Sequence, residues 1–295
     1  MTADAPASPG ARRSILDAHA HVWDRTRTPI DWIDESLPEI DRDFSVAELH
    51  EVAHAAASAH GVGFEGAVLV QALNDAGETA DLLRTARGPV VGWADLDAPG
   101  LEARLAELRQ GPGGQRLAGI RHLAHVDPDP EWLLRPQASR GLDVLAASGL
   151  VFDLVVRPWQ LEIAARVAAA HPDLTFVLDH LGQPPAAEAR DEAAAWERDL
   201  RDLAGLPNVV AKISGIAVRG ERARRRARLE RLGGIALEAF GADRLMFGSD
   251  WPLVRLADDY DSWLGDHLAW SAALSPAEQL ALDSATARRI YGATS

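Results

Sequence analysis

Cysteine is absent from the chain, and lysine is almost absent. Without cysteine there are no disulfides, no thiolate metal ligands and no cysteine nucleophile. Lys212 is the single lysine among 30 lysine and arginine residues. Arginine serves wherever a plain positive charge suffices, so the one exception indicates a position that needs an ammonium group; a lysine that survives by chance is the equal alternative.

The chain also lacks positive net charge and any apolar run long enough to cross a bilayer. Its formal net charge is -14, and such a surface repels nucleic acid and anionic membranes, so we expect neither as a partner. Residues 1–13 contain no apolar segment typical of a secretory signal, and their composition predicts a disordered tail. We expect a cytoplasmic enzyme, with association into homo-oligomers left open.

Eight short apolar segments alternate with longer amphipathic segments along the rest of the chain. Their content of Val, Ile, Leu and Phe is typical of strands buried on both faces. They cover 14–23, 64–72, 89–97, 117–124, 149–157, 174–182, 208–215 and 243–251. This alternation predicts a single α/β domain over 14–295, a (β/α)8 TIM barrel. An open doubly wound sheet is the alternative, but the Gly-rich phosphate turn that usually follows its first strand is missing.

Two local patterns add detail to this fold. Ser45 is followed three residues later by Glu48, the spacing of a capping box, at the start of a helical pattern over 45–61. The segment 30–44 is an insertion after the first strand. An insertion there is of the kind that covers the mouth of a barrel.

Polar and aromatic side chains gather where the predicted strands end. The C-terminal strand ends of a (β/α)8 barrel carry its active site, and the opposite ends here have mostly Ala, Gly and Pro. This asymmetry predicts a site at the C-terminal edge. The residues there are His19, His21, Arg121, His122, Asp153, Arg157, Trp159, Asp179, His180, Lys212, Ser214, Ser249, Asp250 and Trp251.

His19 and His21 form a His-x-His pair at the end of the first strand. Side chains alternate along a strand, so the two imidazoles point the same way, with Cα atoms about 6.6 Å apart. They can share one cation or one substrate oxygen. The alternative is a pair of histidines held by neighbouring hydrogen bonds.

Asp250 and His180 end two further predicted strands. In the stretch MFGSDWPL, Gly248 allows close approach and Pro252 turns the chain away, so Asp250 is placed to bind a metal or to take a proton from water. An Asx turn or a helix N-cap is the alternative. Strand alternation puts Asp179 and His180 on opposite faces, and we expect His180 inside the barrel.

Six motifs together resemble the amidohydrolase superfamily: DAHAHVWD, GIRH, FDLVVRPWQL, LDHLGQP, AKISG and MFGSDWPL, in this order. The closest resemblance is to its sugar-lactonase branch of metal-dependent TIM-barrel hydrolases, which has fuconolactonase-like and rhamnonolactonase-like members. The resemblance runs from about residue 14 to 291. It implies a role in carbohydrate metabolism and hydrolysis of a lactone, either a sugar aldonolactone or a carboxylated lactone.

The resemblance also assigns site residues. His19 and His21 match a first-strand pair, Asp250 matches a last-strand aspartate, and His180 matches a sixth-strand histidine. These residues imply one metal site, formed by His19, His21 and Asp250 with His180 as an optional fourth ligand. Arg121 matches an arginine that contacts the substrate. The fifth strand has Asp153 and no histidine, which argues against a binuclear centre. We therefore expect at most one divalent ion, zinc or a similar metal; the branch also has metal-independent members.

The hypothesis for the reaction is that Asp250 activates a water for attack on the lactone carbonyl. Positive charge from a metal, or from the imidazoles with Arg121, then stabilises the oxyanion. A small polar or anionic lactone is the expected partner. The candidates for binding it are Arg157, Lys212, Gln160, Trp23 and Trp251, with Trp93 and Trp159 as further aromatics.

Two other readings of the same residues stay open. One is a metal-dependent decarboxylase or hydratase of an aromatic or unsaturated acid. The other is a barrel that binds a small ligand without turnover and tolerates loss of Asp250.

Overall fold

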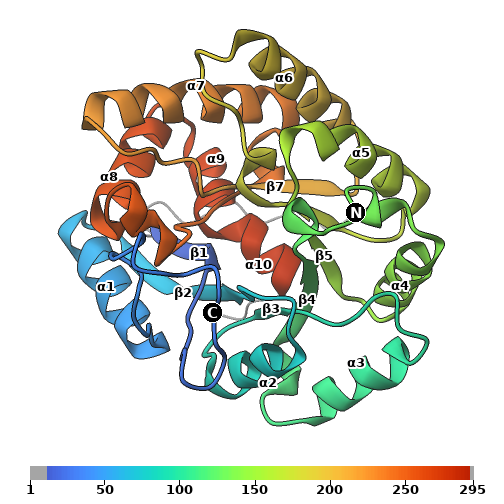
Figure 1. Cartoon of the computed structure of the whole chain (residues 1–295). Helices are drawn as coiled ribbons and strands as arrows, with labels where there is room; N and C mark the ends of the chain where they lie inside the picture. Colours follow the sequence, from blue (N-terminus) through green and yellow to red (C-terminus); the bar gives the residue numbers. More distant parts are fainter. Residues whose placement is uncertain (1–11, 293–295) are drawn as a thin grey trace.

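Eight parallel strands form one barrel with helices around it (Figure 1). The computed structural model describes residues 12–292, so the first eleven residues of the predicted tail lie outside the described part. The strands are β1 (Ser14–Ala20), β2 (Gly63–Val70), β3 (Val90–Gly92), β4 (Leu117–His122), β5 (Val151–Leu154), β6 (Phe176–Leu178), β7 (Val209–Ile213) and β8 (Leu245–Phe247). The helices are α1 (Val46–Ala59), α2 (Ala76–Thr85), α3 (Leu101–Gln110), α4 (Pro136–Ala147), α5 (Leu161–Ala170), α6 (Arg190–Ala204), α7 (Arg222–Phe240), α8 (Tyr260–Ser271), α9 (Pro276–Leu280) and α10 (Thr286–Tyr291).

Each strand pairs in parallel with the next along the chain, in the order β1 to β8. The seam between β8 and β1 is closed by a parallel bridge between Ala20 and Trp251. Two backbone hydrogen bonds flank it, from His21 N to Trp251 O at 2.6 Å and from Asp250 N to His19 O at 2.8 Å. The predicted (β/α)8 barrel is confirmed.

The strands separate two apolar cores. The inner core fills the barrel with one or two apolar side chains, mostly branched, from each of seven strands, as is usual in such barrels. Its strand residues are Leu16, Ala18, Val68, Val70, Val91, Val151, Val177, Val210 and Met246. The outer core, which is larger, lies between the strands and the helices.

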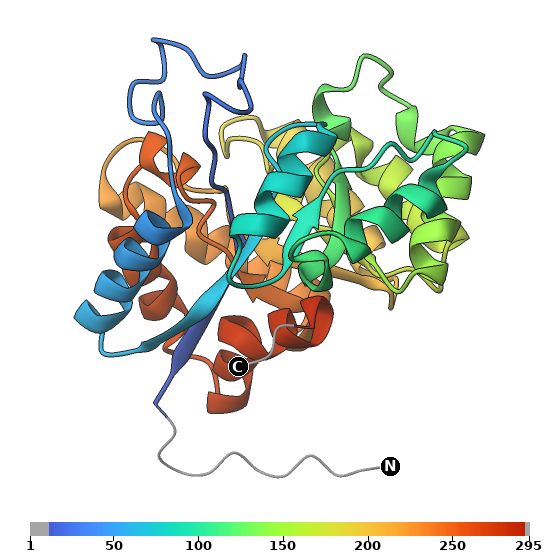
Figure 2. The same cartoon turned by 90° about the horizontal axis from the view of Figure 1, so that it is seen from below.

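The two ends of the barrel are covered differently (Figure 2). The loop that follows β1 lies at one end, tied down by backbone hydrogen bonds of 3.0 Å in both directions between Trp23 and Phe44. Helix α10 closes the opposite end, where Tyr291 joins the inner core. A site at the loop end of the barrel therefore has no opening through the opposite end.

Helix α1 begins where its sequence predicts. The Ser45 side chain accepts a hydrogen bond of 3.1 Å from Glu48 N, which satisfies one of the free N–H groups of the first turn. The Glu48 carboxylate does not complete the capping box but binds the Arg42 guanidinium instead, at 2.6 Å.

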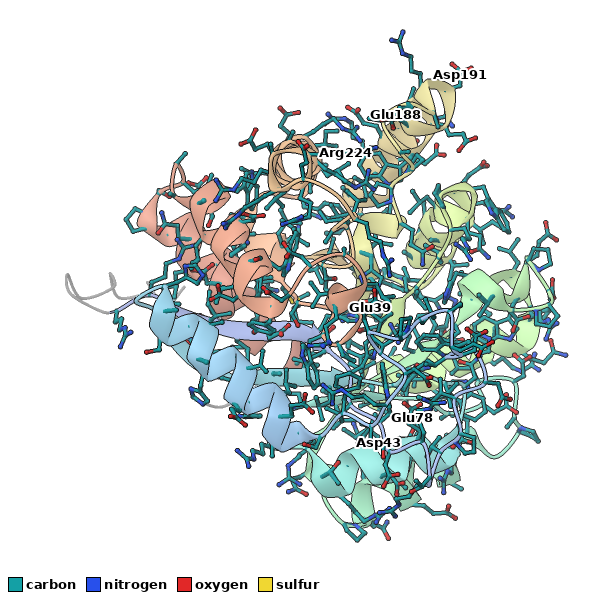
Figure 3. The ribbon with its side chains drawn as sticks, turned by 60° about the vertical axis from the view of Figure 1, so that its left-hand side comes forward. Glu39, Asp43, Glu78, Glu188, Asp191 and Arg224 are labelled. Atoms are coloured by element: carbon teal, nitrogen blue, oxygen red, sulfur yellow. The ribbon has the colours of Figure 1, made fainter. Side chains whose placement is uncertain are left out.

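Charged side chains cover the outside of the helix layer (Figure 3). Arg224 of α7, for example, forms a 3.3 Å ion pair with Glu188, which precedes α6. Among the residues the structure describes, no helix is both long enough and apolar enough to span a membrane.

Candidate active site

An irregularity in β1 turns its histidines into the barrel. Leu16 and Ala18 face the inner core, whereas Ala20 belongs to the outer core. The pairing with β2 shifts register between Asp17 and Ala20, and such a shift re-aims the side chains that follow it. His19 and His21 consequently point together into the loop end of the barrel.

Three donor atoms converge there, at the seam of the barrel. The Nε2 atoms of His19 and His21 are 3.1 Å apart, and Asp250 Oδ1 lies 3.6 Å from the first and 3.4 Å from the second. Zinc bonds of about 2.0–2.1 Å in tetrahedral geometry place two ligand atoms about 3.3 Å apart. The spacing of these donors therefore fits one divalent metal ion.

The hydrogen bonds around the donors agree with this fit. His21 Nδ1 donates to Val70 O at 2.7 Å, which leaves the lone pair of a neutral ring on Nε2. Asp250 Oδ1 is buried and has no hydrogen-bond partner among residues 12–292. His21 Nε2 and Asp250 Oδ1 thus present lone pairs to each other with no proton between them.

Burial and charge set the ionisation of these groups. Burial lowers the pKa of His21, and it lowers the pKa of His19 well below its usual value, although Asp179 opposes this. Burial alone raises the pKa of Asp250, but His180, His21 and His19 outweigh it and bring that pKa to about 2. Neutral imidazoles and an ionised carboxylate are the forms that bind metals.

The backbone is strained at two of these positions. Asp250 has φ 59° and His180 has φ 55°, in the left-handed region that non-glycine residues rarely adopt. Such strain is typical of functional sites, where the surrounding structure holds it in place. Beside Asp250, a Cβ on Gly248 would lie 2.8 Å from His19 Cβ, so the predicted close approach at this glycine is present.

The expectation that Asp179 and His180 face opposite sides is wrong. The β6 strand ends at Leu178, and the chain then enters a left-handed turn, so strand alternation does not extend across the pair. Asp179 is fully buried 3.2 Å from His19 Nδ1, and the His180 ring lies 4.6 Å from the His19 ring. His180 Nδ1 is held by Ser214 Oγ at 3.0 Å.

A buried charge network lies beneath these histidines. Lys212 Nζ is 2.5 Å from Asp153 Oδ2 and 2.9 Å from Asp179 Oδ1. Arg121 donates to Asp179 Oδ2 at 2.9 Å and also to the backbone carbonyl of Gln71. The positive side chains hold the pKa of Asp179 well below its usual value despite its burial.

Comparison with known proteins agrees with this architecture. The Amidohydrolase family matches residues 16–293. L-fucono-1,5-lactonase of Burkholderia multivorans is 38% identical over 291 residues, which covers 94% of this chain and 95% of that protein. The chain belongs to the amidohydrolase family. The expected relationship and an enzyme of the amidohydrolase type are thereby confirmed.

Two further relatives are informative for this amidohydrolase. L-fucono-1,5-lactonase of Burkholderia ambifaria is 33% identical over 257 residues, covering 84% of this chain and 85% of that protein. A crystal structure of an amidohydrolase from Burkholderia multivorans with bound zinc superposes with a TM-score of 0.86 at 36% identity, covering 95% of this chain and 99% of that one.

The predicted substrate-binding residues of this amidohydrolase are dispersed in the structure. Arg157 is exposed at the barrel mouth and donates to His125 O at 3.2 Å. Lys212 has no exposed surface, and the buried Gln160 amide bonds the backbone of Ala124, Pro130 and Arg157. These two residues therefore lie where a substrate cannot contact them.

Two of the tryptophans predicted to bind substrate pack instead against the loop that follows β1. Trp251 is 1% exposed and packs edge-on against Phe44, 5.1 Å between ring centres. Trp23 also packs edge-on against Phe44, 5.5 Å between ring centres, and donates its indole N–H to Arg42 O at 2.8 Å. Both tryptophans anchor the loop after β1, and Trp159 is 58% exposed.

Two further histidines, to which the sequence assigns no role, lie near the mouth. The His122 ring stacks on Trp132 at 3.7 Å and accepts a hydrogen bond from Trp93 Nε1, so its Nε2–H donates to Asp127. Burial, with Arg121 and Arg157 nearby, lowers the pKa of His125 to about 4. His122 lies at the strand end where the GIRH motif places it, whereas no local pattern marks His125.

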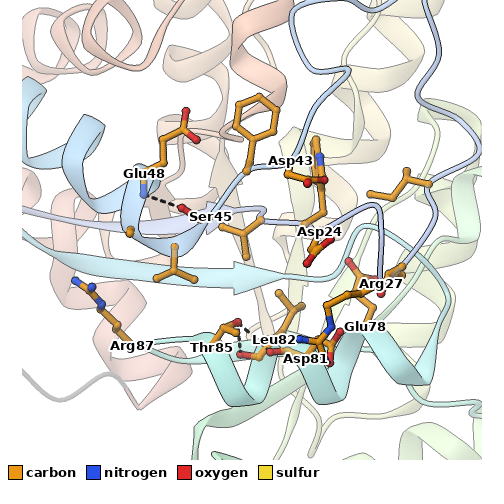
Figure 4. A pocket seen from close by; sticks show the side chains of 17 residues that line it. Asp24, Arg27, Asp43, Ser45, Glu48, Glu78, Asp81, Leu82, Thr85 and Arg87 are labelled. Carbon is orange, nitrogen blue, oxygen red and sulfur yellow. Dashed lines mark hydrogen bonds and ion pairs between the residues drawn. The ribbon is translucent and has the colours of Figure 1, made fainter.

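Two cavities adjoin this region. One of about 250 Å³ reaches Asp250 and is also lined by Gly215, Ser249 and Arg219. A larger one of about 570 Å³ lies between the loop after β1 and helices α1 and α2, with Asp24, Asp43 and Glu48 on its wall (Figure 4). Of the three convergent donor residues, Asp250 lines the smaller cavity, and none of the three lines the larger one.

Proposed function

We propose that this amidohydrolase opens the ring of a lactone, a sugar aldonolactone or a carboxylated lactone, to give the hydroxy acid. The convergence of Asp250 Oδ1 with the Nε2 atoms of His19 and His21 carries the proposal. The substrate class is supported by the relatives named L-fucono-1,5-lactonase, which match nearly the whole chain.

We further propose that His19, His21 and Asp250 hold one divalent ion, zinc or a similar metal. The spacing of their donor atoms supports it, as does the zinc in the related structure. An ion at this position would polarise the lactone carbonyl and acidify a water.

The chain's own residues supply the proton transfers and the charge. Asp250 accepts a proton from the water while the water oxygen bonds to the carbonyl carbon. Asp250 then returns that proton to the ring oxygen when the bond between the carbonyl carbon and the ring oxygen breaks. Arg121 stabilises the negative charge that develops on the carbonyl oxygen. His180, held through Nδ1 by Ser214, keeps Nε2 for a substrate oxygen.

Arg157 selects the substrate in this proposal. Its guanidinium is exposed at the mouth, where it binds Gln183 Oε1 at 3.1 Å as well as His125 O. A cation at the rim of an acidic protein concentrates polar or anionic substrates locally. The substrate's carboxylate or hydroxyls are thus expected to lie on the Arg157 side.

The test is turnover of a panel of sugar-acid and dicarboxylate lactones, followed with a pH indicator because each turnover releases acid. Metal-free protein and protein loaded with Zn²⁺, Mn²⁺ or Co²⁺ are compared. Asp250→Asn is expected to lower kcat by at least about a thousandfold. Asp191→Asn, which removes an exposed carboxylate on α6, is the matched control and should keep the full rate.

Two results would contradict the proposal: no lactone of the panel is opened, or Asp250→Asn retains the wild-type rate. Release of CO2 from an aromatic acid without lactone opening would favour the decarboxylase alternative.

A further inference from the structure

The single lysine of the chain lies in the most enclosed part of the site. Lys212 is on β7, and its side chain has 0% exposed surface. A buried ammonium group is costly unless charged and polar partners surround it. Its partners therefore indicate why a lysine stands at this position.

Lys212 Nζ joins three elements of the barrel. It contacts Asp153 Oδ2 of β5 at 2.5 Å, Asp179 Oδ1 after β6 at 2.9 Å, and His19 Nδ1 of β1 at 3.1 Å. A compact ammonium directs its three N–H donors tetrahedrally from a single atom, whereas the donors of the larger guanidinium of arginine all lie in one plane. Three partners around one nitrogen atom favour the ammonium of lysine over the guanidinium that the chain uses at its other basic positions.

The charges in this cluster balance. Asp153 and Asp179 contribute two negative charges, and Lys212 and Arg121 contribute two positive charges. On the side away from the site, the Tyr291 hydroxyl of α10 donates to Asp153 at 3.0 Å. The cluster therefore extends from the helix that closes the barrel to the histidine at its mouth.

His19 Nδ1 lies between two partners of opposite kind. Asp179 Oδ1 is 3.2 Å away and can accept its proton, while Lys212 Nζ is 3.1 Å away and can only donate. A histidine that binds a metal through Nε2 carries its proton on Nδ1, usually donated to a carboxylate. His19 Nε2 is therefore free to bind a metal when the Asp179 carboxylate is oriented to accept the proton on His19 Nδ1.

We propose that Lys212 is a positioning residue of the cation site: its ammonium clamps Asp179 so that Asp179 accepts the Nδ1 proton of His19 and leaves Nε2 free to bind the metal ion. The inference rests on the proposed binding of a divalent ion by His19, His21 and Asp250. It assigns Lys212 no contact with the substrate.

The experiment measures metal affinity rather than turnover. Co²⁺ is titrated into metal-free protein and followed by its visible absorption, and Zn²⁺ affinity is obtained by competition with a chelator. Lys212→Met is expected to weaken both affinities ten- to a hundredfold and to reduce the intensity of the Co²⁺ bands. Near-ultraviolet circular dichroism of the metal-free proteins checks that the fold is retained.

A charge-balanced variant separates positioning from charge balance. Lys212→Met/Asp153→Asn removes one charge of each sign and provides a foldable protein if Lys212→Met alone does not fold. Its affinity is expected to stay at least tenfold below wild type. Tyr291→Phe, which alters the cluster without touching Asp179 or His19, should bind Co²⁺ within about twofold of wild type.

Wild-type affinity in either Lys212 variant would overturn the inference, because the clamp would then be unnecessary. That outcome is distinct from failure of the proposed function, in which the wild-type protein itself binds no Co²⁺ or opens no lactone.

Discussion

Gly215 and Gly149 adopt the same left-handed backbone but have different surroundings. Their φ angles are 60° and 64°; a Cβ on Gly215 would lie 2.3 Å from His180 Nδ1, whereas a Cβ on Gly149 would meet nothing within 4 Å. Gly215→Ala should displace His180 and lower kcat/KM about a hundredfold. Lactone kinetics measure the loss of kcat/KM, and urea unfolding measures the change in the free energy of unfolding.

Gly149→Ala is the matched control for this substitution. Both variants carry the cost of a left-handed alanine, about 1 kcal/mol. Only Gly215→Ala should also lose activity. Equal rates in the two variants would show that the reaction does not depend on the position of His180.

Arg157 permits a test of substrate binding apart from chemistry. Within residues 12–292, its exposed guanidinium binds only the neutral atoms His125 O and Gln183 Oε1, so its charge is available to a ligand. Arg157→Ala should raise KM for an anionic lactone about tenfold and leave kcat within about twofold. A neutral lactone serves as control. An equal rise in KM for both lactones would indicate that the loop, and not the charge, was affected.

The positions of the proposed ligand residues were predictable from sequence, whereas those of their supporting residues were not. His19, His21 and Asp250 stand at strand ends, where barrel enzymes carry their sites. Asp179 was assigned to the wrong face because a left-handed turn interrupts the strand alternation. The depth of Lys212 could not be predicted either, because depth depends on which neighbouring strands supply its carboxylates.

At the scale of elements, all eight predicted strands are present but shorter than expected. The apolar run 89–97, for example, yields only β3, Val90–Gly92. Beyond Gly92, the Trp93 backbone bonds the Thr79 side chain of α2 instead of a neighbouring strand. Hydrophobicity predicts that a segment is buried, but it does not predict where ladder pairing gives way to such contacts.

In the turn after α9, one carboxylate links helix α8 to the segment that precedes β1. Asp283, in the π-helical turn Ala281–Ala285, binds His267 Nε2 of α8 at 2.8 Å and Arg13 before β1 at 3.0 Å. Burial alone raises the pKa of Asp283, but the hydrogen bonds from His267 and Arg13 outweigh it, so the pKa is lowered. A lowered carboxyl pKa means that the stabilisation is present above the unfolded-state pKa of about 3.9 and is lost as the pH falls through the lower folded-state pKa.

Asp283→Asn should therefore lower the free energy of unfolding by about 2–4 kcal/mol at pH 7 and by much less near pH 3. Urea unfolding at both pH values measures this. Asp173→Asn, at an exposed position, is the control and should change neither value by more than about 0.5 kcal/mol. An equal loss of the free energy of unfolding at both pH values would show that the charge of the Asp283 carboxylate does not contribute to stability.

For the molecule as a whole, the seam between β8 and β1 is where the barrel has the least ladder pairing. In the part of the chain that the structure describes, pairing across the seam is one bridge from Ala20 of β1 to Trp251, which follows β8, with one backbone hydrogen bond on either side. The proposed metal ligands come from both sides of this seam, His19 and His21 on one and Asp250 on the other. A bound ion would therefore link the first strand of the chain to the last.

This arrangement predicts that a divalent ion stabilises barrel closure as well as the reaction. Zn²⁺ at a hundred times its Kd should add about 2.7 kcal/mol to the free energy of unfolding and raise Tm by about 5 °C, reversibly with chelator. Hydrogen exchange of the His21 and Asp250 amides, which form the seam bonds, should slow more than exchange in β4 or β5. Asp250→Ala removes the link and should abolish both effects. Stabilisation that persists in this variant, or that slows exchange evenly around the barrel, would place the ion away from the seam.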